Sequence, residues 1–290
     1  MAAIPVRARR VAGVLLVWLL IYAFLVVVAS FLPVGAPDWY LYFQPRRDIY
    51  DYPPFIHVLL ALLPSLPFLS GLTLTTMLFV LWRRGARWEH AAAVFTAMPF
   101  YWTLWAGQID AVPLLGLAFL PWGIPLVMLK PQVAVWYVWA WWRQRPDKWK
   151  AVLGTLAFLA LTIVIWGWWP LRWRPPDSIT STYNVSLWTV WWPLGLLALV
   201  GALLERDLDR AVALGALGSP YVASNNYLLL LPALTRLSGL PLMLVWLTTW
   251  TGVAVLVFGD VARPLIAVFP LSLWLALAWQ ARRESRGSGC

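Results

Sequence analysis

Residues 11–32 read VAGVLLVWLLIYAFLVVVASFL, an apolar run that contains no charged side chain. A helix needs about 20 apolar residues to cross the hydrocarbon core of a bilayer, so this run is long enough to span one. It exceeds the apolar region of a signal peptide, and no small-residue cleavage site follows it. Arg7, Arg9 and Arg10 precede the run. We therefore expect a retained first membrane span whose N-terminal end faces the cytoplasm.

The composition of the whole chain is that of a membrane protein. Of its 290 residues, 62% are hydrophobic and 12% are charged, whereas a soluble domain is about half apolar and about a quarter charged. The 23 Trp and 10 Tyr residues fit the aromatic belts of a bilayer interface. We expect an all-α, polytopic transmembrane helical bundle of about 8–11 spans including short broken helices. Residues 1–290 are expected to form a single transmembrane domain.

Apolar segments and short polar loops alternate along the rest of the chain. Residues 111–142 are interrupted by four prolines, and we expect three short broken helices there rather than one long crossing. The other expected segments are a broken helix at 55–68, spans at 68–82, 89–106, 151–169, 187–204, 241–258 and 264–281, and short segments at 211–219 and 227–238. The outer loops 33–54 and 170–186 are the expected site region.

The formal net charge of +10 is explained mainly by the positive-inside rule, because the basic residues lie in short loops between apolar runs. We therefore expect cytoplasmic N- and C-termini and no nucleic-acid partner. Sixteen of the 22 basic residues fall on the cytoplasmic side in this arrangement. The exceptions are Arg46, Arg47, Lys130, Arg172, Arg174 and Arg263. Basic residues on the outer face suggest anion binding there.

Several kinds of chemistry are excluded. Cys290 is the only cysteine, so no intrachain disulfide or thiolate metal cluster forms. His57 and His90 are expected on opposite faces and cannot share a zinc ion. Motifs for nucleotide binding and zinc hydrolysis are missing. We expect neither a metal nor a cofactor. The sequon at Asn184 adjoins a span, so we do not expect it to be glycosylated.

Asp38 is the candidate catalytic residue. It lies among aromatic side chains just after the first span, and partial burial would raise its pKa toward a value useful to a general base. Aromatic neighbours such as Tyr40 also suit the faces of sugar rings. The alternative is an exposed carboxylate that caps a short helix. Asp48 and Asp51 are rival bases, or ligands of a divalent cation.

The outer basic residues are candidate phosphate ligands. Guanidinium groups match phosphate oxygens, and two separate loops carry them: Arg46 and Arg47 in one, Arg172 and Arg174 in the other. Their alternatives are snorkelling to lipid headgroups and pairing with nearby carboxylates. Lys130 lies within an apolar stretch, where an ammonium requires a partner or a water-filled cavity; snorkelling is its alternative.

Amide and carboxylate side chains at the outer ends of the spans could bind hydroxyl groups of a sugar or an acceptor. Helix capping is the equally acceptable explanation for them, and a structural hydrogen bond is the alternative for the histidine. These candidates are Tyr40, Asp48, Asp51, His57, Gln108, Asp110, Asn225 and Asn226.

Five short motifs occur in a familiar order. They are Asp38–Tyr40, Tyr50–Pro54, Gly107–Asp110, Leu129–Gln132 and Ser219–Pro232. In this order they resemble the polyprenyl-phosphate-mannose-dependent mannosyltransferases of the GT-C glycosyltransferase superfamily. The resemblance implies an inverting transferase with a lipid-linked sugar donor, with Asp38 as the base and Lys130 in contact with donor phosphate. The chain is short for that family and has Asn225 and Asn226 where such proteins often have histidine.

The expected function is therefore transfer of a sugar, with mannose as the first candidate, from a polyprenyl-phosphate donor to an acceptor hydroxyl. The acceptor is a glycan, a lipid or a protein, and the reaction is metal-independent and extracytoplasmic. One alternative is a non-catalytic GT-C-like subunit of a membrane assembly, with membrane-protein partners. Another is a lipid-phosphate carrier or flippase. All three involve membrane lipids.

Overall fold

The computed structural model describes residues 6–32, 35–40, 53–145, 148–171 and 184–287. Helices make up 81% of the structure, and no strand occurs within these ranges. The predicted all-helical fold is therefore confirmed.

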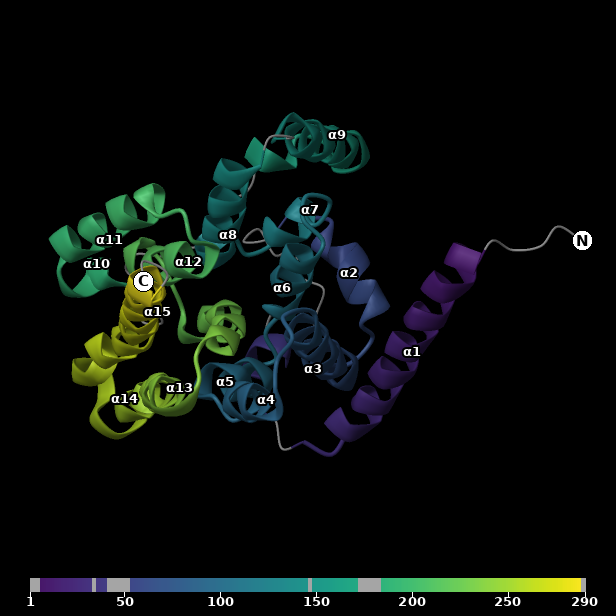
Figure 1. Cartoon of the computed structure of the whole chain (residues 1–290). Coiled ribbons are helices and arrows are strands. Elements are labelled where there is room, and N and C mark those ends of the chain that lie inside the picture. Colours follow the sequence, from purple (N-terminus) through teal and green to yellow (C-terminus); the bar gives the residue numbers. More distant parts are fainter. Residues whose placement is uncertain (1–5, 33–34, 41–52, 146–147, 172–183, 288–290) are drawn as a thin grey trace, which may run out of the picture.

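Figure 1 shows the helices, labelled in chain order. In chain order they are α1 (Val6–Ala29), α2 (Ile56–Leu62), α3 (Leu66–Arg83), α4 (Trp88–Phe95), α5 (Met98–Ala106), α6 (Ala111–Ala118), α7 (Ile124–Val127), α8 (Pro131–Gln144), α9 (Lys148–Trp166), η2 (Trp169–Leu171), α10 (Leu187–Val190), α11 (Trp192–Leu204), α12 (Leu208–Gly218), η3 (Ser224–Arg236), α13 (Gly239–Thr248), η4 (Thr249–Gly252), α14 (Val253–Phe258), η5 (Gly259–Ala267) and α15 (Val268–Gly287).

Three of the described helical segments are long and apolar enough to cross a membrane. They are Leu66–Arg83 (α3), Lys148–Trp166 (α9) and Val261–Ser285, which combines most of η5 with α15. Gly13–Ala29, Trp192–Leu204 and Gly239–Val255 are shorter apolar helices. In Figure 1, α1 lies beside α3 at one edge of the molecule, and α9 lies beside α7 at another. Both edge helices expose many large apolar side chains, among them Phe24 and Val164. Apolar surfaces of this extent are typical of contact with lipid.

Proline positions explain how the expected segments divide. The segment 111–142 forms three helices, α6, α7 and α8, as expected, and their crossing of the membrane stays a prediction. The expected single spans 89–106 and 187–204 are wrong in detail, because each is two helices. The second helix of each pair has proline in its first turn, Pro99 in α5 and Pro193 in α11. Proline cannot donate to the preceding turn and clashes with its carbonyl, so the helix restarts there.

The helix η3 forms the centre of the core. Every residue from Asn225 to Leu234 is buried, and η3 packs against α3, α4, α5, α8, α12 and α15. The 3₁₀ geometry over 13 residues is unusual, since runs longer than 3–4 residues are uncommon. Its two ends lie in two separate polar clusters, and the first of these clusters contains most of the described candidate residues.

Candidate functional site

The carboxylate of Asp110 is the centre of a buried polar cluster. Its side chain is 0% exposed. Oδ2 accepts hydrogen bonds from Lys130 Nζ at 2.8 Å and Asn225 Nδ2 at 2.6 Å, and Oδ1 accepts one from Asn226 Nδ2 at 2.7 Å. Lys130 also donates to Gln108 Oε1. We call these five residues the Asp110 cluster; all five are candidates from the sequence, and the fold brings them together.

Local backbone geometry explains how this cluster forms. The helix α5 ends at Gly107, which adopts the left-handed conformation with φ of 70°, and the chain turns so that Gln108 and Asp110 lie at the start of α6. Lys130 precedes Pro131, which disfavours the helical conformation, and Lys130 is the non-helical N-cap residue of α8 with φ of −143° and ψ of 77°. Asn225 and Asn226 form the first turn of η3.

Helix capping, the alternative explanation, applies to Asn226 but not to Asp110. Asp110 is the N-cap residue of α6, yet its side chain makes no capping hydrogen bond. Asn226 does cap η3, because its Oδ1 accepts from the backbone N–H of Ala223 at 3.0 Å. Lys130 is 6% exposed and ion-paired. Snorkelling therefore does not explain Lys130, which has found the buried partner that an ammonium in an apolar stretch requires.

The Asp38 segment packs directly against the turn that carries Gln108 and Asp110. The backbone N–H of Ala36 donates to Trp105 O at 2.6 Å. A Cβ atom at Gly107 would lie 2.8 Å from Trp39 Cβ and 3.2 Å from Ala36 Cβ, so this approach requires glycine. Trp39 is buried in an apolar cluster that includes Ile109. The Asp38 backbone is thereby fixed beside the Asp110 cluster.

Asp38 itself is half-buried and makes no hydrogen bond with any of the described residues. Burial raises the pKa of its carboxyl above the usual range. The positive charge of Lys130 lowers that pKa and the negative charge of Asp110 raises it further, so both groups lie within electrostatic reach. The predicted direction of the shift is confirmed. A carboxylate with a raised pKa and no bound donor is suited to accept a proton.

The other candidates are placed less completely. Tyr40 is 54% exposed. His57 is in the first turn of α2, and only its backbone is described. Arg46, Arg47, Asp48, Asp51, Arg172 and Arg174 lie outside the described residues. The predicted phosphate-binding role of the four arginines therefore stays a prediction, as does the role of the two aspartates.

A second polar cluster, not predicted from the sequence, lies at the other end of η3. Arg84 binds both carboxylate oxygens of Asp209, at 2.9 and 3.1 Å, and the Tyr137 hydroxyl donates to the same carboxylate at 3.2 Å. Arg236, the last residue of η3, contacts both oxygens of Asp207 at 2.7 Å. Arg236 is eleven positions after Asn225, and at a rise of about 2 Å per residue the two clusters lie roughly 22 Å apart along η3.

Hydrogen bonds also hold His90 and Asn184 in the core. His90 is buried between the backbone N–H of Arg87 and the carbonyl of Leu237, so its role is structural. Asn184 is buried and binds the backbone of Pro220 and Val222, so the sequon is inaccessible in the folded protein. Within the described ranges, no group of three or more His, Cys, Asp or Glu side chains is arranged to hold a metal ion.

Comparisons with protein-family models, with curated proteins and with solved structures found no match to this chain.

Proposed function

We propose that this chain is an integral membrane glycosyltransferase. It transfers a sugar, with mannose as the first candidate, from a polyprenyl-phosphate donor to an acceptor hydroxyl. The observation that carries the proposal is the position of Asp38. Its half-buried carboxyl has a raised pKa and lies next to a buried Lys130–Asp110 ion pair, in a segment packed against Gly107. A general base needs such a setting.

In this mechanism Asp38 takes the proton of the acceptor hydroxyl as its oxygen attacks the anomeric carbon. The bond from that carbon to the phosphate oxygen breaks, and the polyprenyl phosphate leaves with the bonding electrons. The transition state has oxocarbenium character, as in glycoside hydrolysis. Arg46, Arg47, Arg172 and Arg174 are the proposed ligands of the departing phosphate. No metal ion takes part in the proposed reaction, and the configuration at the anomeric carbon is inverted.

The pairing of Lys130 changes the role that we assign to it. Its ammonium already donates to Asp110 and Gln108. As placed, Lys130 balances the buried carboxylate and sets the potential at Asp38. Contact with a donor phosphate would require the ammonium to exchange one of these partners. We therefore propose Lys130 as a positioning residue for Asp38 and for the first turn of η3.

The proposed membrane orientation places both termini in the cytoplasm and Asp38 on the extracytoplasmic side of a multi-pass protein. Two observations support it. The 18-residue helix α3 begins in the apolar cluster that holds Trp39 and ends at the basic pair Arg83 and Arg84, about 27 Å away at 1.5 Å per residue. Two arginines, Arg84 and Arg236, also meet around Asp209 at that end of α3, and arginine favours the cytoplasmic face.

A second candidate function is a non-catalytic GT-C-like subunit of a membrane assembly. This function is favoured by the complete burial of Asp110, whose carboxylate already accepts hydrogen bonds from three side chains. The polar groups of the Asp110 cluster are therefore bound to each other rather than open to a substrate. A lipid-phosphate carrier would use the same region without a base.

Sugar transfer by purified protein from radiolabelled polyprenyl-phosphate mannose separates these functions. The comparison is wild type, Asp38→Asn and, as a control at the other end of the molecule, Glu89→Gln. For an enzyme with Asp38 as its base, Asp38→Asn lowers the rate by about 10²–10⁴-fold, and Glu89→Gln leaves it unchanged. Equal rates for wild type and Asp38→Asn would remove Asp38 as the base. Folded wild-type protein that transfers to no acceptor in a broad set would favour the subunit or the carrier.

A further inference from the structure

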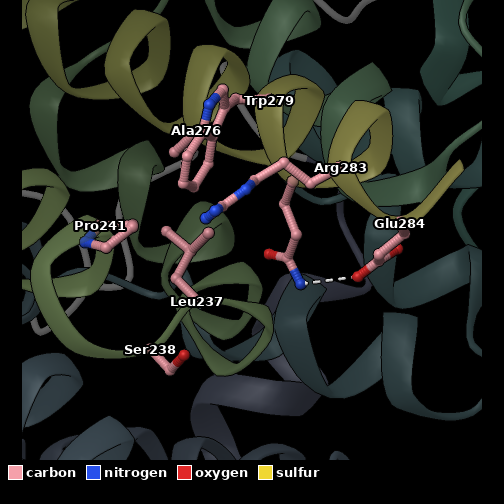
Figure 2. Close-up of a pocket in the computed structure, with 8 residues that line it drawn as sticks. Leu237, Ser238, Pro241, Ala276, Trp279, Arg283 and Glu284 are labelled. Carbon is pink, nitrogen blue, oxygen red and sulfur yellow. Dashed lines mark hydrogen bonds between the residues drawn. The ribbon is translucent and has the colours of Figure 1, made fainter. Parts of the chain in front are cut away.

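A cavity of about 460 Å³ lies where the end of α15 meets the start of α13. Figure 2 shows the residues that line it. They are Leu237, Ser238, Pro241, Ala276, Trp279, Gln280, Arg283 and Glu284. Leu237 directly follows Arg236, so the cavity is at the end of η3 opposite the Asp110 cluster. It is therefore separate from the proposed catalytic region.

The cavity presents a cation and an anion from consecutive residues of α15. The guanidinium carbon of Arg283 lies 4.5 Å from the centre of the Trp279 ring. The carboxylate of Glu284 accepts a hydrogen bond from Gln280 Nε2 at 3.0 Å, which Figure 2 draws as a dashed line. In the same view the guanidinium lies on the side of the indole that faces Leu237. The two charges are thus held apart by local partners and are not paired with each other.

The remaining walls combine apolar surface with hydrogen-bond donors. Leu237, Pro241 and Ala276 form apolar parts of the lining. Ser238 is the N-cap residue of α13, and its side chain makes no capping hydrogen bond. Its hydroxyl lines the cavity, and the first N–H groups of α13 lack partners within the helix. This part of the lining suits a phosphate oxygen.

The position of the cavity indicates a lipid. It lies at the end of the candidate span Val261–Ser285, where a membrane helix reaches the headgroup region. Trp279 is 49% exposed, and half-exposed tryptophan is typical of that interface. A soluble anion would meet Glu284 as well as Arg283. A zwitterionic headgroup with a phosphate and a primary ammonium satisfies both charges, and only a primary ammonium donates hydrogen bonds to the carboxylate.

We propose that this cavity binds the phosphoethanolamine headgroup of a membrane phospholipid. The phosphate binds Arg283 and Ser238, the ammonium binds Glu284, and the glycerol backbone lies against Leu237 and Pro241. The proposal rests on this cavity alone and does not depend on the glycosyltransferase function.

The test uses the full chain, purified in detergent and stripped of lipid. Binding of short-chain phosphatidylethanolamine, phosphatidylcholine and phosphatidylglycerol is measured by native mass spectrometry and by the rise in Tm. Arg283→Gln and Glu284→Gln are compared with Arg282→Gln, an adjacent exposed arginine that does not line the cavity. We expect phosphatidylethanolamine to bind the wild type best. Each cavity substitution weakens it at least about tenfold, as for loss of a hydrogen bond to a charged group, and Arg282→Gln has no effect.

Three results would overturn the proposal. In the first, phosphatidylglycerol binds as tightly as phosphatidylethanolamine and Glu284→Gln changes neither affinity, which identifies a general anionic-lipid surface. Equal losses for Arg282→Gln and Arg283→Gln identify non-specific attraction to interfacial charge. No preference among the three lipids leaves no headgroup site. Because the substituted side chains are exposed, the Tm values without lipid should agree and show that each variant is folded.

Discussion

Asn226 and Asp110 are 116 positions apart in the chain, and Asn226 Nδ2 donates a 2.7 Å hydrogen bond to Asp110 Oδ1. The same asparagine caps η3 through Ala223. Its amide therefore connects the first turn of the central helix to the start of α6. Lys130 reaches the same carboxylate from the start of α8. Three segments distant in sequence thus meet at one buried ion pair, and this meeting makes the Asp110 cluster a stability element whatever its chemistry.

Replacement of Asp110 by Asn should destabilise the protein by about 3–5 kcal/mol, because it leaves the buried ammonium of Lys130 without its counter-charge. The free energy of unfolding in detergent measures this. The double variant Asp110→Asn with Lys130→Met removes both charges and should recover part of the loss. A single variant as stable as wild type would show that the ion pair carries no stability.

Substitution of Gly107 by Ala should cost more than the same change at Gly85. Both glycines have positive φ, 70° and 66°, so both variants include the backbone strain. A Cβ atom added at Gly107 would lie 2.8 Å from Trp39 Cβ, whereas a Cβ atom added at Gly85 would have no neighbour within 4 Å. We expect a loss of about 1–2 kcal/mol for Gly85→Ala and a larger loss of unfolding free energy for Gly107→Ala. Equal losses would mean that the Asp38 segment is not held by this contact.

The sequence predicted those features that depend on local pattern. Prolines between 111 and 142 marked the breaks that give α6, α7 and α8. The isolated Lys130 indicated a partner or a water-filled cavity, and the structure shows the partner. Its partner Asp110, 20 residues away, could not be identified, because the two meet only after the chain folds back through α7. The pairing of Arg84 with Asp209 spans 125 positions and leaves no periodic signal. The neighbours of η3 are also distant in sequence, since it contacts helices from α3 to α15.

The raised pKa of Asp38 predicts the acidic limb of a pH–rate profile. A general base acts when deprotonated, so kcat/KM should fall as pH drops through the raised pKa, at a higher pH than for an ordinary aspartate. Burial is the main cause, Lys130 lowers the pKa and Asp110 raises it. Lys130→Met should therefore move this limb to higher pH. Measurement of kcat/KM against pH for both proteins tests the relationship, and a limb that moves to lower pH would contradict it.

The Asp207–Arg236 pair should make stability depend on acid pH. Burial raises the pKa of Asp207, but the hydrogen bond and charge of Arg236, with the backbone N–H of Arg210, outweigh burial and hold this pKa below its usual range. A lowered folded-state pKa contributes stability above the unfolded pKa, and this contribution is lost as pH falls through the folded value. Arg236→Gln should cost about 1–3 kcal/mol at neutral pH, as for hydrogen bonds to charged groups. The loss should shrink toward acid pH.

Arg206→Gln is the matched control for this pair, because Arg206 is exposed and contributes only its backbone to nearby hydrogen bonds. Unfolding free energies of wild type, Arg236→Gln and Arg206→Gln, measured from neutral to acid pH, give the comparison. Wild type and Arg206→Gln should follow the same curve, and Arg236→Gln should approach that curve as Asp207 is protonated. A constant offset for Arg236→Gln at every pH would show that Arg236 stabilises η3 by packing and through Asp209 rather than through the charge of Asp207.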